Sequence, residues 1–147
     1  TDFELLLPDD YINNITERGT LYNKLSTIKT EEELLNYEKE LIDRFGEMPP
    51  QVIDLLNSVR VKWIAINMGL ERVIMKQGKF VGYFVSDQQS SFYQSDDFNN
   101  VLKFAQQKPH FISIKEKSTR TGLKLLMTID KINHIDHVLK VLAPFIT

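Results

Sequence analysis

The chain has 147 residues, 42% of them hydrophobic, no cysteine, a formal net charge of −2 and a pI near 5.9. This length allows one hydrophobic core or two small lobes, while the acidic balance argues against a partner dominated by phosphate groups. The lack of cysteine excludes disulfides and thiolate chemistry and suits a cytoplasmic protein. No apolar run approaches the roughly 20 residues of a membrane span. Because the first residue is Thr1 rather than Met, we expect either a fragment excised from a longer chain or a processed chain.

The N-terminal part is predicted to be helical as far as residue 68. Residues 3–7 form a short apolar run, a strand or a tether, and residues 8–10 (PDD) are a helix-start signal. One or two short helices are expected over residues 9–28. Their apolar positions are Ile12, Ile15, Leu21, Tyr22, Leu25 and Ile28.

The next helix is predicted over residues 30–45. Thr30 and Glu33 have the spacing of a capping box, in which the hydroxyl and the carboxylate each accept a backbone N–H. The expected apolar face consists of Leu34, Leu35, Leu41, Ile42 and Phe45.

A sharp corner is predicted after this helix. Gly46 can adopt the left-handed conformation that ends a helix, and Pro49 and Pro50 suit the first turn of the next one. That next helix is expected over residues 49–68, with Met68-Gly69 as its stop. Its expected stripe is Val52, Leu55, Leu56, Val59, Trp63 and Ile66.

After Gly69 the hydrophobic period changes from helical to alternating, which predicts a β-β-α-β-β-α half. Strands are expected at 71–76 and 80–85 around a turn at 77–79, and at 111–115 and 123–129 around a loop at 118–122. A helix capped by Ser95 runs to about Gln107 before Pro109, with Phe98, Val101, Leu102 and Ala105 facing inward. Asp130 is expected to cap a last helix, whose apolar positions are Ile132, Ile135, Val138, Leu139 and Leu142.

Three charged residues of the 30–45 helix form the candidate site. At about 100° per residue, Glu40, Asp43 and Arg44 fall on the side away from the apolar face. They are either a solvated face, in which Glu40 and Arg44 pair at i, i+4, or a docking surface with a forked donor and two carboxylates. Spacing alone leaves both open.

No reaction centre is indicated. The chain has no glycine-rich phosphate loop, and no nucleophile elbow supports a triad. His134 and His137 stand at i, i+3 near Asp130 and Asp136, but without a clear third ligand they do not predict a metal site. His110 is expected to serve a turn.

The basic residues Lys115, Lys117, Arg120 and Lys124 cluster around the second hairpin. They suit a strand edge protected by charge, or a contact with nucleic acid that is interrupted by Glu116.

The ordered blocks LPDDYI (7–12), Arg18 with Leu21-Tyr22, Glu33-Leu34 and ELIDRFG (40–46) with Pro49 resemble the C-terminal domain of the bacterial transcription-repair coupling factor. The match covers residues 3 to about 70. One departure is at Gly19: the family usually has an Arg-Leu-x-Leu-Tyr run, and this chain has Arg18-Gly19-Thr20-Leu21-Tyr22. A glycine there lowers helix stability by up to about 1 kcal/mol.

The resemblance implies an α+β regulatory domain, 1–147, with a helical subregion (1–69) and an α+β subregion (70–147) that holds a small antiparallel sheet. Proteins of that family are ATP-dependent DNA translocases that displace stalled RNA polymerase and recruit nucleotide excision repair. In them, this domain docks on an N-terminal module similar to excision-repair protein B and masks the surface for excision-repair protein A. The matching docking positions here are Glu40, Asp43 and Arg44.

By the same resemblance, ATP and magnesium belong to the motor domains of the parent, and this part needs no cofactor. It is expected to be a monomer without enzymatic activity and without direct contact to nucleic acid or membrane. Two alternatives remain. One is a stand-alone module that binds an unrelated protein through the same corner. The other is a small hydrolase that uses His110 or His137 with carboxylates.

Overall fold

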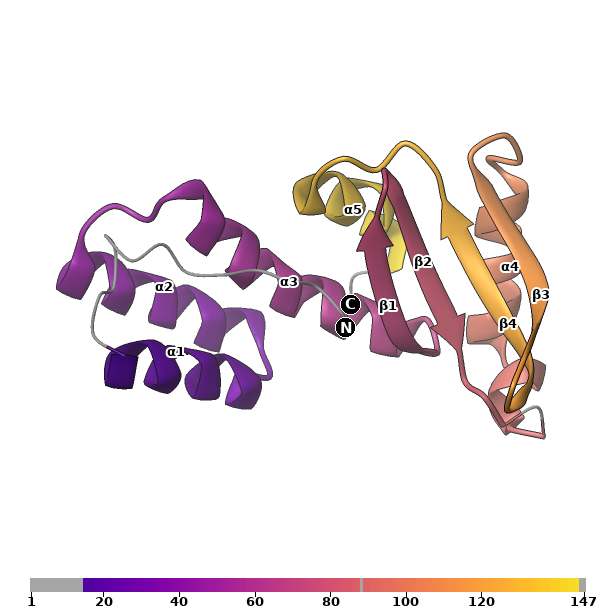
Figure 1. Ribbon diagram of the computed structural model, residues 1–147, viewed down its shortest axis with the longest axis horizontal. Coiled ribbons are helices and arrows are strands. Elements are labelled where there is room, and N and C mark those ends of the chain that lie inside the picture. Colours follow the sequence, from indigo (N-terminus) through magenta and orange to yellow (C-terminus); the bar gives the residue numbers. More distant parts are fainter. Residues whose placement is uncertain (1–14, 88, 146–147) are drawn as a thin grey trace. The chain divides into compact units, whose positions relative to one another are not determined.

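The computed structural model describes residues 15–87 and 89–145 (Figure 1). The chain divides into two compact units, of which the first ends at Arg60 and the second begins at Val61. The predicted change from helices to strands at Gly69 lies within the second unit. The predictions for residues 3–7 and for the helix start at 8–10 fall outside the described residues.

The helical unit contains α1 (Ile15–Thr27), α2 (Glu31–Phe45) and the first part of α3 (Pro50–Asn67). α1 continues through Gly19, so the glycine at this position does not interrupt the helix. Most of the predicted apolar positions are buried, although Tyr22 is 36% exposed. The buried ones are Leu21, Leu25, Ile28, Leu34, Leu41, Val52, Leu55 and Leu56.

Helix α3 buries different faces in its two parts. In the first part Val52, Leu55 and Leu56 are buried, as the predicted stripe required. Beyond residue 60 the buried positions are Val61, Ile64 and Ala65, which lie about half a turn away at about 100° per residue. The prediction of one continuous stripe was therefore wrong. Val59 and Trp63 are only half-buried, and Ile66 is 61% exposed.

The second unit holds a four-stranded antiparallel sheet in the order β1-β2-β4-β3. Its strands are β1 (Leu70–Lys76), β2 (Lys79–Phe84), β3 (Ile112–Thr119) and β4 (Gly122–Ile129). Every strand of the described residues follows Gly69, which confirms the predicted α+β arrangement. The first hairpin closes through Gln77 and Gly78, whose φ angles of 53° and 74° fit a two-residue turn with both positions left-handed.

The second hairpin is longer than predicted. Thr119 pairs with Gly122, so the expected loop at 118–122 shrinks to the two residues Arg120 and Thr121. The Thr119 hydroxyl donates to the Gly122 carbonyl at 2.7 Å, which stabilises this tight turn.

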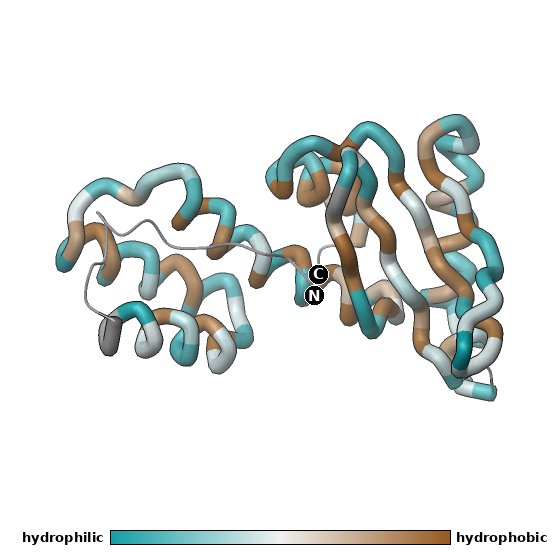
Figure 2. The backbone as a smooth tube through the Cα atoms, viewed as in Figure 1, coloured by the Kyte–Doolittle hydropathy of each residue, from teal (hydrophilic) through white to brown (hydrophobic). Residues whose placement is uncertain are grey.

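One face of the sheet forms the core of the second unit. Phe80 and Phe84 of β2 are fully buried, as are Met127 and Ile129 of β4. Figure 1 shows α4 (Asp96–Gln106) and α5 (Ile135–Val141) behind the sheet, and Figure 2 shows hydrophobic segments recurring between hydrophilic ones along the strands. Two 3₁₀ turns, η1 (Ser91–Gln94) and η2 (Ala143–Phe145), complete this unit.

Two details of these helices differ from expectation. In α4, capped by Ser95 as predicted, Val101, Phe104 and Ala105 are buried, while Phe98 and Leu102 are half-buried. The last helix begins at Ile135 with His134 as its cap.

Asp130 therefore does not cap α5. Lys131 has a positive φ of 62°, and the Ile132 N–H donates to the Gly78 carbonyl at 2.8 Å. These two features keep the chain out of the helical conformation directly after Asp130, so the helix starts later than its first apolar residue. Among the described residues, no helix is both long and apolar enough to cross a membrane.

Candidate functional site

Helix α2 carries the candidate site and begins as its sequence requires. The Thr30 hydroxyl accepts the Glu33 N–H at 3.1 Å, which confirms the cap. The Glu33 carboxylate accepts a backbone N–H in return, but that of Lys29 at 3.4 Å. The Thr30 hydroxyl and the Glu33 carboxylate therefore both accept backbone N–H groups at the start of the helix. The first turn also carries three acidic residues, Glu31 to Glu33, which interact favourably with the positive end of the helix dipole.

The corner after α2 is fixed by glycine and proline. Gly46 has φ 86° and ψ −166°, a region open to glycine alone, and its N–H donates to the Ile42 carbonyl at 2.9 Å. The prediction of a left-handed residue is right in the sign of φ, while ψ is extended. The Pro49 carbonyl then accepts the Val52 N–H at 3.0 Å, and Pro50 is the first residue of α3.

The three predicted site residues lie together on α2 and are exposed. The side chains of Glu40, Asp43 and Arg44 are all exposed to solvent. The Arg44 guanidinium carbon lies 4.9 Å from the centroid of the Phe45 ring, within the range of a cation–π contact. This contact holds the guanidinium beside the corner.

The apolar face of α2 is narrower than predicted. Leu34 and Leu41 are buried, but Leu35 and Ile42 are 44% and 43% exposed, and Phe45 is half-buried. Leu35 and Ile42 are seven residues apart and so lie above one another on the flank of the buried stripe. The fully buried residues of α2 are therefore two leucines seven residues apart, and Leu35 and Ile42 form an exposed apolar strip beside them.

An interaction network that the sequence did not predict joins α2 to α3 inside the helical unit. Arg60 donates through Nη2 to Glu31 at 2.8 Å and through Nε at 3.0 and 3.1 Å, and through Nη1 to Asn57 Oδ1 at 2.7 Å. Asn57 is the buried polar residue of this unit among those described. Since the two partners are 29 residues apart, no local pattern could have indicated the pair.

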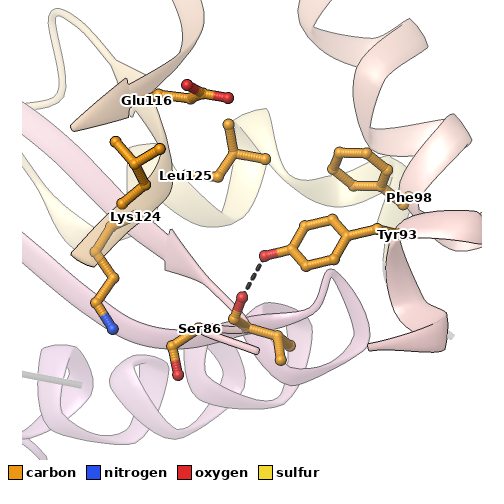
Figure 3. A pocket seen from close by; sticks show the side chains of 8 residues that line it. Ser86, Tyr93, Phe98, Glu116, Lys124 and Leu125 are labelled. Atoms are coloured by element: carbon orange, nitrogen blue, oxygen red, sulfur yellow. Dashed lines mark hydrogen bonds between the residues drawn. The ribbon is translucent and has the colours of Figure 1, made fainter. Parts of the chain in front are cut away.

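The second unit contains an open pocket of about 220 Å³ that sequence reasoning missed (Figure 3). The Tyr93 hydroxyl donates to the Val85 carbonyl across it. Burial first, and then the carboxylates of Glu71 and Asp87, raise the pKa of Tyr93 above its usual 10. The lining residues are Val85, Ser86, Tyr93, Phe98, Glu116, Leu123, Lys124 and Leu125.

Aromatic packing stabilises this pocket. Phe98 meets Phe84, Phe92 and Tyr93 edge to face, with ring centroids 5.8, 5.4 and 5.1 Å apart. The sequence signal for this cluster was the pair of adjacent aromatic residues at 92 and 93, shortly before Phe98, which was predicted to face inward. The lining holds one carboxylate, Glu116, and one amine, Lys124, and no histidine.

His134 is the cap of helix α5, and the other two histidines lie in the first turn of that helix and in the turn before β3. His134 Nδ1 accepts the Asp136 N–H at 3.2 Å as the cap of α5, and the His137 N–H donates to the His134 carbonyl at 3.0 Å. His110 is exposed in the turn before β3. In the part of the chain that the structure describes, no three His, Asp or Glu side chains gather as a metal site would require.

The domain family named for transcription-repair coupling factor, TRCF, matches residues 1–95. The transcription-repair-coupling factor of Staphylococcus epidermidis is 30% identical over 125 residues, which cover 85% of this chain and 10% of that protein. The Escherichia coli protein of the same name is 38% identical over 68 residues, which cover 46% of this chain and 6% of that protein.

A crystal structure of the C-terminal domain of transcription-repair coupling factor aligns with a TM-score of 0.68 and 25% identity, and covers 99% of this chain and 86% of that one. The chain spans about a tenth of the length of the S. epidermidis relative. The family model covers more than half of this chain, and the structural match extends over both units. The chain therefore belongs to the transcription-repair coupling factor family, in the region that forms the C-terminal domain of those proteins.

Proposed function

We propose that this chain is a regulatory, non-catalytic domain of a transcription-repair coupling factor. Through Glu40, Asp43 and Arg44 it docks on an N-terminal module similar to excision-repair protein B in the same parent chain. In the docked state it masks the surface that recruits excision-repair protein A. The motor domains of the parent, which use ATP and magnesium, carry out translocation along DNA and removal of RNA polymerase.

The observation that supports this role is the exposure of all three charged side chains beside a rigid corner. The buried residues of α2, Leu34 and Leu41, lie on another side of the helix. Arg44 has a forked donor suited to carboxylates, and Glu40 and Asp43 suit a guanidinium on a partner. Docking would remove these charges from water, so each pair formed there would affect the dissociation rate strongly.

The test uses the full-length parent with Glu40→Ala, Asp43→Ala and Arg44→Ala combined. Truncating one side of a desolvated charge pair costs about 2–5 kcal/mol, so we expect the docked state to open. The affinity for excision-repair protein A, measured by calorimetry, then rises. Glu32→Ala is the matched control, since Glu32 is an exposed carboxylate of the same helix outside the candidate surface, and it should leave the affinity unchanged.

An unchanged affinity in the triple variant would refute the docking role and leave the three residues as a solvated face. The stand-alone-module alternative predicts that result together with binding of the isolated chain to an unrelated protein. ATP hydrolysis by this chain alone, if it persisted in a highly purified sample, would refute the non-catalytic assignment, because the sequence has no phosphate-binding loop.

A further inference from the structure

Charge is strongly segregated along this chain. Residues 4–60 contain six Lys and Arg against twelve Asp and Glu, a net charge of −6. Residues 61–147 contain twelve Lys and Arg against seven Asp and Glu, a net charge of +5. The net charge of −2 for the whole chain therefore hides a basic second unit, and the sheet of that unit shows where its basic residues gather.

The strand register places a row of residues on the face of the sheet opposite the buried one. Arg72 pairs with Tyr83, Tyr83 with Leu126, and Leu126 with Lys115, which crosses all four strands. Directly opposed residues project to the same face, and Phe84, next to Tyr83, projects into the core. The row is therefore on the outer face.

Neighbouring rows continue this outer face. The next row in one direction along the strands consists of Ile74, Val81, Thr128 and Ser113. In the opposite direction, the next pair on the same face is Lys117 with Lys124. In Figure 3 the Lys124 side chain extends away from the rings of Tyr93 and Phe98. We call this surface the basic face, and define it by Arg72, Ile74, Lys79, Val81, Tyr83, Ser113, Lys115, Lys117, Lys124, Leu126 and Thr128.

The rim of the basic face is almost uniformly positive. Arg72, Lys79, Lys115 and Lys117 are exposed, and Lys124 is half-buried. Strand alternation brings one carboxylate to this side, that of Asp130, which lies 3.8 Å from Lys79. A single-signed rim of this kind attracts partners of opposite charge and speeds their association.

The centre of the basic face is apolar. Ile74, Val81, Tyr83 and Leu126 are half-buried, so a ligand can still cover part of each side chain. The Arg72 guanidinium carbon lies 5.6 Å from the centroid of the Tyr83 ring, which joins rim and centre. Edge protection explains Lys115 and Lys117 on β3 and Arg72 on β1, because these are the two edge strands of the sheet. It does not explain Lys79 and Lys124 on the inner strands, or the apolar centre.

The composition of the centre decides between two anionic partners. Single-stranded nucleic acid is held by several aromatic side chains on which successive bases stack. Here three of the four central side chains are aliphatic, and Arg72 already lies over the one ring. Aliphatic side chains ringed by lysines instead complement the apolar stripe and acidic flanks of an amphipathic protein segment.

We propose that the basic face is a second interaction surface, and that it binds an acidic amphipathic helix of a protein. It uses other residues, in the other unit, than the docking surface of α2. The two proposals therefore stand or fall separately.

The test is an NMR titration of the isotope-labelled 147-residue chain with a synthetic helical peptide that has leucines at helical spacing and glutamates on both flanks. Amide shifts should concentrate on the strand residues of the basic face. Affinity should fall as salt rises, since exposed charges are screened. A second peptide with glutamine in place of every glutamate should bind roughly tenfold more weakly or not at all.

Charge reversal provides the matched comparison. Lys115→Glu with Lys117→Glu should weaken peptide binding roughly tenfold or more, while Lys62→Glu with Lys103→Glu, the same change in net charge at exposed helical positions, should have less than about a twofold effect. The proposal is overturned if the peptide shifts spread evenly over the chain, or if the glutamine peptide binds as well. It is also overturned if a single-stranded oligothymidine binds the basic face more tightly than the acidic peptide.

Discussion

The guanidinium of Arg60 binds the carboxylate of Glu31 through two nitrogens and the buried side chain of Asn57 through a third. Arg60 is the less exposed partner of the ion pair, at 22% against 53% for Glu31. Arg60 should therefore contribute more than Glu31 to the free energy of unfolding of the helical unit.

We expect Glu31→Ala to lower the free energy of unfolding by at most about 1 kcal/mol, because the carboxylate is exposed and screened. Arg60→Ala should lower it by about 1–3 kcal/mol, since it leaves the Asn57 carbonyl oxygen buried without this donor. Urea unfolding followed by circular dichroism measures both. Glu32→Ala, at the neighbouring exposed position, is the control. Equal losses for Glu31→Ala and Arg60→Ala would contradict the role assigned to Asn57.

A second prediction separates the docking surface from the core on one helix. Replacing Glu40, Asp43 and Arg44 by alanine should change the stability of the isolated chain by about 0–1 kcal/mol in total, because they are exposed. Leu41→Ala should cost about 2–5 kcal/mol, because Leu41 is fully buried. Phe45→Ala should cost less than Leu41→Ala, as Phe45 is half-buried. A large loss in the charge variant would make these residues structural.

The third prediction concerns the close approach of Gly69 to Phe92. A Cβ at Gly69 would lie 2.2 Å from the tip of the Phe92 ring, and the φ of this residue is 81°. Gly69→Ala should therefore cost about 1–3 kcal/mol from crowding, plus about 1–2 kcal/mol from the backbone. Differential scanning calorimetry should also show that Gly69→Ala costs less in a Phe92→Leu background. Full additivity of the two substitutions would argue against the contact.

The fourth prediction is a pH dependence set by Tyr93. The pKa of Tyr93 is raised in the folded state, first by burial and then by Glu71 and Asp87. Between the usual value of 10 and the raised one, the unfolded chain releases a proton that the folded chain keeps. The stability provided by this group is therefore complete below pH 10 and is lost as the pH rises through the raised pKa.

Tyr93→Phe should remove this alkaline loss and cost about 0.5–1.5 kcal/mol at neutral pH through the lost hydrogen bond to Val85. Unfolding by urea at a series of pH values measures the slope. Tyr83→Phe is the control and should keep the wild-type alkaline slope. A Tyr93→Phe variant with an unchanged slope would show that another group titrates.

The parts of the fold that the sequence predicted well are those set by neighbouring residues. The Thr30 cap, the Pro49-Pro50 start and the Gln77-Gly78 turn each depend on a few adjacent side chains and their allowed backbone angles. The motif blocks around Glu40 likewise carried the resemblance to the family.

The parts that failed depend on contacts distant in sequence. Helical periodicity placed Ile66 in the core, but α3 changes its buried face at the boundary between the units. Asp130 was predicted to cap the last helix, but the Ile132 N–H donates instead to the carbonyl of Gly78, which lies in the turn of the first hairpin. The net charge of the whole chain concealed the basic face, because only the strand register brings Arg72 and Lys115 onto the same face of the sheet.

The sheet topology has a consequence for how the second unit folds. Each hairpin closes through a two-residue turn and can form within about 1–10 μs, because its strands are adjacent in sequence. The contact between β2 and β4 consists of four residue pairs, from Phe80–Ile129 to Tyr83–Leu126, and it closes a loop that contains the whole of α4. Its entropic cost comes before any burial of Phe80 against Ile129 is gained. We therefore expect the joining of two preformed hairpins to limit the folding rate, with Met127 and Ile129 as the positions whose truncation slows folding most.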